Sequence, residues 1–200
     1  MQADTGLTAF AGKRKIATGS LHALAHALKT LVTREPEAQI LVFDDATGSQ
    51  VDLNLHGSLE DVLRRLPRPR SAAPAPPDEA PLAVPRTAGR PRLGVVAREI
   101  TLLPRHWEWL ASQPGGASVA LRKLVEHAQR DNQAADEQRQ AREAAYRFMN
   151  ALAGDEPGFE EASRALFAGQ RAPFLSCVRD WPADVREHVL QLAQRGWHDS

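Results

Sequence analysis

Cysteine and net charge are almost missing from this 200-residue chain, and each absence excludes a class of protein. The single cysteine, Cys177, excludes an internal disulfide and cannot supply the thiolate cluster of a structural zinc site. Lys plus Arg and Asp plus Glu balance at 25 each, so no field of the whole molecule attracts nucleic acid or an anionic membrane. No apolar run reaches the roughly eighteen residues of a membrane span, and none follows the charges near the N-terminus. We therefore expect a cytoplasmic protein that does not contact a membrane.

Motifs of the common enzyme classes are also missing. The chain contains no G-x-S-x-G, G-x-G-x-x-G or Cys-x-x-Cys. His22 and His26 have the spacing of two metal ligands on a helix, but no acidic residue adjoins the first and no third ligand is marked. The turn DDATG lacks the alternating acids of a calcium loop and the lysine of a P-loop. We expect no metal and no cofactor.

Two residue pairs could still support catalysis. Cys177 and His188 could act as nucleophile and base, although the apolar context FLSCV favours a buried, inert thiol. His106 and Glu108 stand in HWEW, but near neighbours on a helix point apart and would not converge on one substrate. An enzyme that uses His106 or Cys177 remains an alternative; the expectation is a non-enzymatic protein with no identified small-molecule substrate.

A proline-rich stretch divides the chain. Apolar residues make up 42% of the sequence and charged residues 25%, the composition of a folded protein. Eight of the 14 prolines fall in residues 67–91, which show no helical or strand period. This predicts a linker at 67–91 between an N-terminal unit, 1–66, and a C-terminal unit, 92–200.

The N-terminal unit alternates strands and helices. Ser20 can cap a helix whose apolar residues follow helical spacing, and Ser58 with Asp61 resembles a capping box. The predicted elements, in chain order, are strands 7–10 and 15–19, helix 21–32, strands 40–43 and 51–55, and helix 59–66. The order is ββαββα, and the simplest packing is a small antiparallel sheet with helices on one face.

The C-terminal unit is mostly helical and opens with strand, helix, turn and helix. Residues 95–103 alternate like a strand, Pro104 suits the first position of a helix, and PGG ends that helix. The next helix begins near Ser118, with Leu121, Leu124, Val125 and Ala128 as its buried stripe. Residues 129–143 have only alanine as an apolar residue and predict a solvated helical extension or, alternatively, a hinge. A further amphipathic helix begins at Phe159 and stops at Gly169, and Pro173 and Pro182 suit the first turns of two more. The fold class is therefore α+β.

Residues 95–128 resemble the ribbon–helix–helix family of bacterial DNA-binding proteins. In that family the strands of two subunits pair into a ribbon in the major groove, and amides that open the second helix hold a phosphate. The resemblance places Ile100 and Leu102 on the inward side of the strand, and Trp107 and Leu110 in the core. It makes Glu99 and Thr101 base-reading residues, and it makes a phosphate-binding turn of Gly116, Ala117 and Ser118.

Local charge supports the same interpretation. Between residues 90 and 130 there are seven Lys/Arg and three Glu, a net charge of 7 − 3 = +4 in a neutral protein. Arg90 and Arg92 lie in AGRPR, which resembles a minor-groove arm, and Arg122 and Lys123 lie on the second helix. We expect a transcriptional regulator that binds DNA as a homodimer. The alternative is a protein–protein interaction module with exposed tryptophans and no DNA binding.

The whole chain also resembles a family of uncharacterised bacterial proteins, DUF2239. The phrases that carry the resemblance are LVFDDATGSQVDL, GRPRLGVVAREITLLPRHWEWLASQPGGAS, AAYRFMNALAGDEPGFEEASRALFAG and WPADVREHVLQLA. They span nearly the full length, and this resemblance implies no particular function.

Overall fold

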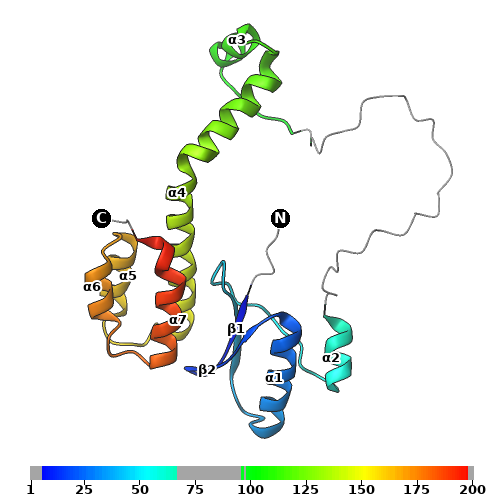
Figure 1. Ribbon diagram of the computed structural model, residues 1–200, viewed down its shortest axis with the longest axis vertical. Helices are drawn as coiled ribbons and strands as arrows, with labels where there is room; N and C mark the ends of the chain where they lie inside the picture. Colours follow the sequence, from blue (N-terminus) through cyan, green and yellow to red (C-terminus); the bar gives the residue numbers. More distant parts are fainter. Residues whose placement is uncertain (1–5, 67–95, 97, 198–200) are drawn as a thin grey trace, which may run out of the picture. The chain divides into compact units, whose positions relative to one another are not determined.

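The computed structural model in Figure 1 describes residues 6–66, 96 and 98–197. The chain splits into two compact units. One, which we call the core unit, consists of Met1–Pro67 and Asp131–Ser200; the other, the insert unit, is Arg68–Arg130. The predicted linker at 67–91, with Arg90 and Arg92, lies outside the described residues.

The core unit contains a three-stranded antiparallel sheet in the order β2-β1-β3. Its strands are β1 (Leu7–Ala11), β2 (Arg14–Gly19) and β3 (Ile40–Asp44). The predicted hairpin between β1 and β2 is confirmed, and its turn contains Gly12 at φ 56°, a conformation that a residue without Cβ adopts at little cost. The combination of this sheet with helices confirms the α+β class.

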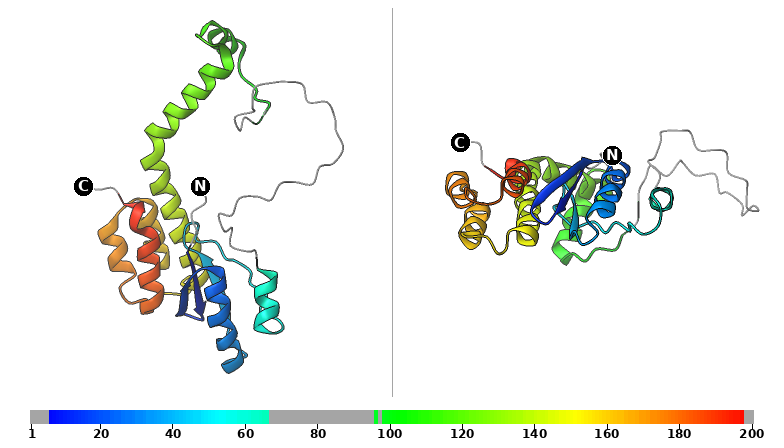
Figure 2. Two further views of the ribbon diagram at one scale, coloured as in Figure 1. Left: turned by 45° about the vertical axis from the view of Figure 1, so that its right-hand side comes forward. Right: turned by 90° about the horizontal axis from the view of Figure 1, so that it is seen from below.

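Helices α1 (Leu21–Arg34) and α2 (Leu59–Arg65) begin where their capping residues predict. The Ser20 side chain accepts a hydrogen bond from the Ala23 amide, and Ser58 and Asp61 form the reciprocal capping box. Leu24 and Leu28 of α1 pack against Leu7, Ala9 and Val42 of the sheet, so one sheet face is covered by α1 (Figure 2).

The predicted strand at 51–55 is wrong. Beyond β3 only the isolated bridge Phe43↔Gln50 is formed, and residues 51–56 belong to no strand. Their alternating burial remains, because Val51, Leu53 and Leu55 pack against the α1 cluster. Two side chains form hydrogen bonds with backbone carbonyl groups of this segment. Lys29 Nζ donates to Leu55 O at 3.0 Å, and Arg65 Nη2 donates to Asn54 O at 3.3 Å. The N-terminal order is therefore ββαβα.

From Gly116 onward, the described residues form four α-helices. They are α4 (Gly116–Leu152), α5 (Phe159–Phe167), α6 (Arg171–Cys177) and α7 (Ala183–Ala193), followed by the 3₁₀ turn η1 (Gln194–Gly196). The predicted amphipathic helix from Phe159 is confirmed as α5, and the predicted helical extension at 129–143 is confirmed as part of α4. Pro173 lies in the first turn of α6 and Pro182 is the N-cap of α7.

The second face of the sheet packs against these helices. Alternate residues of a strand point to opposite faces, so Phe10 lies opposite Leu7 and Ala9. The Phe10 ring centroid lies 5.2 Å from that of Phe148 on α4, and that of Phe43 lies 4.9 Å from the same ring. Residues before and after the proline-rich stretch therefore share one hydrophobic core, and the sheet has helices on both faces rather than on one (Figure 2).

The predicted strand at 95–103 is not formed within the single chain, among the residues that the structure describes. Residues 96 and 98–103 belong to no strand, and the three-stranded sheet of the core unit does not include them. A strand needs a partner for its N–H and C=O groups, and the described part of the chain supplies none here. Helix α3 (Pro104–Ser112) does begin at Pro104, as predicted. None of the described helices combines the length and the apolar character that crossing a bilayer requires.

Candidate functional site

Large exposed apolar side chains are concentrated in the insert unit. Of the nine that the described residues contain, seven lie between residues 96 and 125, namely Val96, Ile100, Leu103, Trp107, Trp109, Leu124 and Val125. We call these seven residues the apolar surface. Only Leu110 and Ala120 are buried apolar residues among the described residues 96–130. A contiguous stretch so rich in exposed apolar groups is typical of an interaction site.

The insert unit places α3 and the first part of α4 one after the other around a two-glycine turn. Gly115 and Gly116 have φ values of 86° and 74°, a region that other residues rarely adopt. A Cβ at Gly115 would lie 3.1 Å from the Val119 side chain, so this turn also needs the small residue. Beside the turn, a hollow of about 180 Å³ is lined by Trp109, Gln113, Pro114, Ala120, Lys123 and Leu124.

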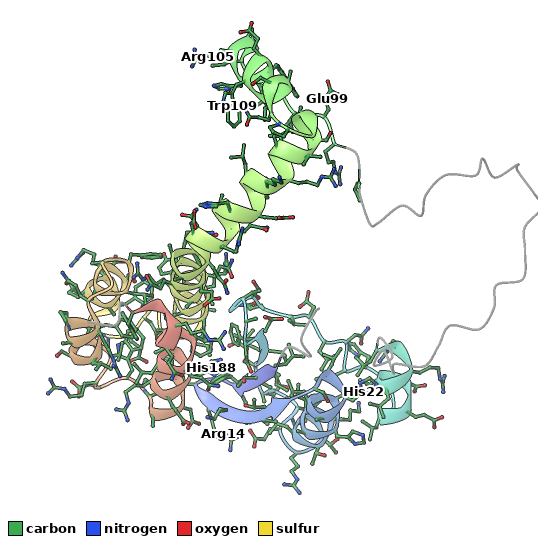
Figure 3. All side chains as sticks on the ribbon, turned by 45° about the horizontal axis from the view of Figure 1, so that its top comes forward. Arg14, His22, Glu99, Arg105, Trp109 and His188 are labelled. Atoms are coloured by element: carbon green, nitrogen blue, oxygen red, sulfur yellow. The ribbon has the colours of Figure 1, made fainter. Side chains whose placement is uncertain are left out.

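The described residues of the predicted DNA-binding set all lie in the insert unit. Glu99 and Thr101 are exposed on the segment before α3, and Figure 3 labels Glu99 with Arg105 and Trp109. Gly116, Ala117 and Ser118 open α4, with the first two half-buried and Ser118 exposed.

Arg122 and Lys123 are exposed on α4, and Arg122 Nε donates to Ser118 O at 3.1 Å. The predicted buried stripe of α4 is wrong: Leu121 is only half-buried, and Leu124, Val125 and Ala128 are exposed. The reason is that too few apolar groups of the described insert unit pack against this side of the helix.

The candidate catalytic residues are not brought together. His106 and Glu108 are both exposed on α3. Cys177 is half-buried on α6, while Nε2 of His188 faces a carboxylate, Asp45, rather than the thiol. His22 is half-buried and His26 exposed, and no three His, Cys, Asp or Glu side chains of the described residues could hold a metal together.

A buried polar pair in the core unit was missed by sequence reasoning. His188 is 1% exposed, and its ring centroid lies 4.6 Å from that of Phe148 and 5.5 Å from that of Phe10. Its Nε2 lies 3.6 Å from Oδ1 of Asp45, which is beyond hydrogen-bond range. Neither atom has a hydrogen-bond partner among the described residues. Leaving such a buried polar atom without a partner costs about 1–3 kcal/mol.

Burial moves the pKa of both members of this pair toward the neutral form. It lowers the pKa of His188 to about 4, with a further contribution from the positive charge of Lys15. It raises the pKa of Asp45, an effect that a hydrogen bond from Thr8 opposes. The imidazole beside Asp45 is therefore neutral near pH 7 and does not compensate a charge on this carboxyl group.

Asp45 also lines a polar hollow of about 470 Å³ in the core unit. The walls come from the residues before β1, the turn after β3, the C-terminal part of α4 and the end of α7 with η1. Its polar side chains are Asp45, Glu137, Gln140, Gln191, Gln194 and Arg195. These positions are far apart in the sequence and belong to no common motif, so no local signal could have identified the hollow.

The fold and these two surfaces define an α+β protein whose compact core carries a small helical insert unit with an apolar surface. The sequence matches the family described as "Uncharacterized protein conserved in bacteria (DUF2239)" over residues 6–193. The chain belongs to this family, which confirms the full-length resemblance. No curated protein and no solved structure matches it.

Proposed function

We propose that this protein is a non-enzymatic cytoplasmic regulator that forms a homodimer through the insert unit and binds DNA with it. The observation that carries the proposal is the apolar surface, because seven large exposed apolar side chains fall within residues 96–125 while only two apolar residues of the described insert unit are buried. A segment with this composition gains little from folding alone and needs a partner to remove its apolar groups from water.

A second copy of the chain is the partner that best suits this surface. An isologous interface buries the same patch twice, so one copy brings an equal set of apolar groups to the other. Residues 98–103 alternate in sequence like a strand but pair with no strand of the described chain, and pairing with the same segment of a second copy would satisfy their backbone groups. The resemblance to ribbon–helix–helix proteins favours this arrangement.

Positive charge on the same unit supports DNA as the ligand of the dimer. Among the described residues 98–130 there are five Lys/Arg and three Glu, a net charge of 5 − 3 = +2 per chain. A dimer doubles that charge over a short surface, and phosphate contacts provide most of the affinity of such proteins for DNA. Arg122 and Lys123 are the exposed basic pair nearest the start of α4.

Light scattering on the purified full-length chain tests the dimer. We expect twice the mass of one chain at micromolar concentration, and a strict monomer would contradict the proposal. A gel shift with mixed-sequence duplex DNA at low salt tests the second step. A dimer that gives no shift would support the alternative described next.

The alternative, a protein–protein interaction module, is favoured by the two tryptophans of α3. Trp107 is 40% exposed and Trp109 is 50% exposed, and tryptophan is enriched among residues that dominate protein interfaces. The hollow beside Trp109 could take one apolar side chain of a partner. In this case a partner protein would protect both indole rings from solvent, whereas DNA would not. Tryptophan fluorescence measures this protection.

A further inference from the structure

The polar hollow of the core unit contains opposite charges that do not neutralise each other. Arg195 and Asp45 both line it, yet Arg195 forms no ion pair with any carboxylate in the described part of the chain. Glu137, also on the wall, has one oxygen occupied by the Gln133 amide at 2.9 Å. A small molecule with both a positive and a negative group could therefore contact both charged side chains.

The backbone of Asp45 is anchored, and one oxygen of its carboxylate has no hydrogen-bond partner among the described residues. Its backbone amide donates to Gly6 O at 2.9 Å, and behind the side chain the His188 ring is wedged between Phe10 and Phe148. Oδ1 of Asp45 has no hydrogen-bond partner among the described residues, nor does the 1% exposed His188 at Nε2. Because Oδ1 is shielded from solvent and faces His188, Oδ2 is the oxygen of this carboxylate that a ligand in the hollow could reach.

Glycine at position 6 keeps space next to this carboxylate. A Cβ at Gly6 would lie 2.9 Å from Oδ2 of Asp45, so any larger residue would crowd the oxygen on the side where Gly6 lines the hollow. The remaining polar wall consists of three amide side chains, Gln140, Gln191 and Gln194, each with a donor and an acceptor. The volume of about 470 Å³ is in the range of small-molecule sites.

We propose that this hollow binds a small zwitterion of the amino-acid class, with its ammonium group on Asp45 and its carboxylate on Arg195. The amides provide hydrogen bonds to the rest of the molecule. Asp45 acts as the ammonium acceptor because it is the least exposed charged group of the wall, with a side chain that is 17% exposed. This site is independent of the proposed DNA binding, since all of its residues belong to the core unit.

The experiment is a titration of the full-length chain with each of the twenty L-amino acids. Thermal unfolding is measured at millimolar concentration first, and isothermal calorimetry follows for those that raise the Tm. We expect at least one amino acid to bind. Its N-acetyl derivative, which lacks the ammonium, and its α-amide, which lacks the carboxylate, should each bind at least about tenfold more weakly, the loss expected for one buried charge-assisted hydrogen bond.

Variants test which residues are responsible. Asp45→Asn and Arg195→Gln should each weaken the binding of the best amino acid at least about tenfold, while the matched control Arg171→Gln on α6, outside the hollow, should leave it unchanged. Circular dichroism checks that each variant is folded, and Arg195→Gln changes a side chain that is exposed.

Three results would overturn the site. They are the absence of binding by any amino acid at millimolar concentration, equal binding of the N-acetyl derivative or of the α-amide, and equal affinity in Arg195→Gln and the wild type.

Discussion

Nε2 of His188 lies 3.6 Å from Oδ1 of Asp45, so a residue of α7 and a residue just after β3 form a polar pair inside the core. The ring of His188 packs on Phe10 and Phe148, which also join the sheet to α4. The pair therefore lies where the N-terminal sheet packs against the C-terminal helices, and its protonation is linked to the stability of the whole core unit.

Acid should destabilise the protein through His188. Burial lowers the pKa of His188 from 6.5 to about 4, so between these values the unfolded chain binds a proton that the folded chain does not. Above pH 6.5 His188 does not lower the free energy of unfolding. As the pH falls from 6.5 toward 4, the free energy of unfolding decreases, with a slope of at most about 1.4 kcal/mol per pH unit. Asp45 has the opposite sign, since its raised pKa favours the neutral form, and it offsets part of this loss at the acid end of the range.

Urea unfolding at pH 7, 6 and 5 measures this dependence. The variant His188→Gln removes the titrating group, and its free energy of unfolding should change less over the same range than that of the wild type. Identical slopes for the two proteins would show that His188 does not carry the effect.

A charge on the apolar surface should weaken the dimer. Leu124→Asp and Ile100→Asp each place a carboxylate where about half of an apolar side chain is now exposed, 48% for Leu124 and 49% for Ile100. Losing one buried apolar side chain removes about 1.5–3 kcal/mol, which raises the dimer Kd by about ten- to a hundredfold. Light scattering over a concentration series measures the shift. The matched control is Leu175→Asp on α6, an exposed leucine of the core unit, and a similar shift in this control would argue against the insert unit as the interface.

Removing a basic side chain from α4 should weaken DNA binding without changing its sequence preference. Arg122→Ala or Lys123→Ala should lower the affinity for every duplex about equally and reduce the slope of log K against log salt by about 1. Fluorescence anisotropy at several salt concentrations measures both quantities. Arg171→Ala, on α6 of the core unit, is the control and should leave the slope as it is; unchanged binding in both α4 variants would exclude the proposed contact.

The turn after β3 should tolerate no side chain at Gly48. Gly48 has a φ of 66°, and a Cβ there would lie 2.0 Å from the backbone oxygen of Ala144 on α4. Gly48→Ala must therefore displace the turn from the helix, in addition to the roughly 1–2 kcal/mol of left-handed strain. Gly12→Ala carries the same strain at φ 56°, with nothing within 4 Å of its Cβ, and serves as the matched control. In urea unfolding the Gly48 variant should lose clearly more stability than the Gly12 variant, and equal losses would contradict the close contact.

Local elements of this fold could be predicted because their causes lie within a few residues. Ser20 and the Ser58–Asp61 box begin helices since their side chains bind amides of the next turn, and Pro104 begins α3 since it has no N–H to lose. The hairpin of β1 and β2 follows from a short turn between two strands.

Which alternating segments became strands, and which residues line the core and the polar hollow, depended on the tertiary structure. Residues 51–55 and 98–103 alternate as strands do. In the first segment Lys29 and Arg65 bind the carbonyls of Leu55 and Asn54, and the second segment pairs with no strand within the described chain. A strand depends on hydrogen bonds to another segment, which its own residues do not specify. The same reason applies to the core and the polar hollow, because Asp45 and His188 come together only when helices from the end of the chain pack on a sheet from its beginning.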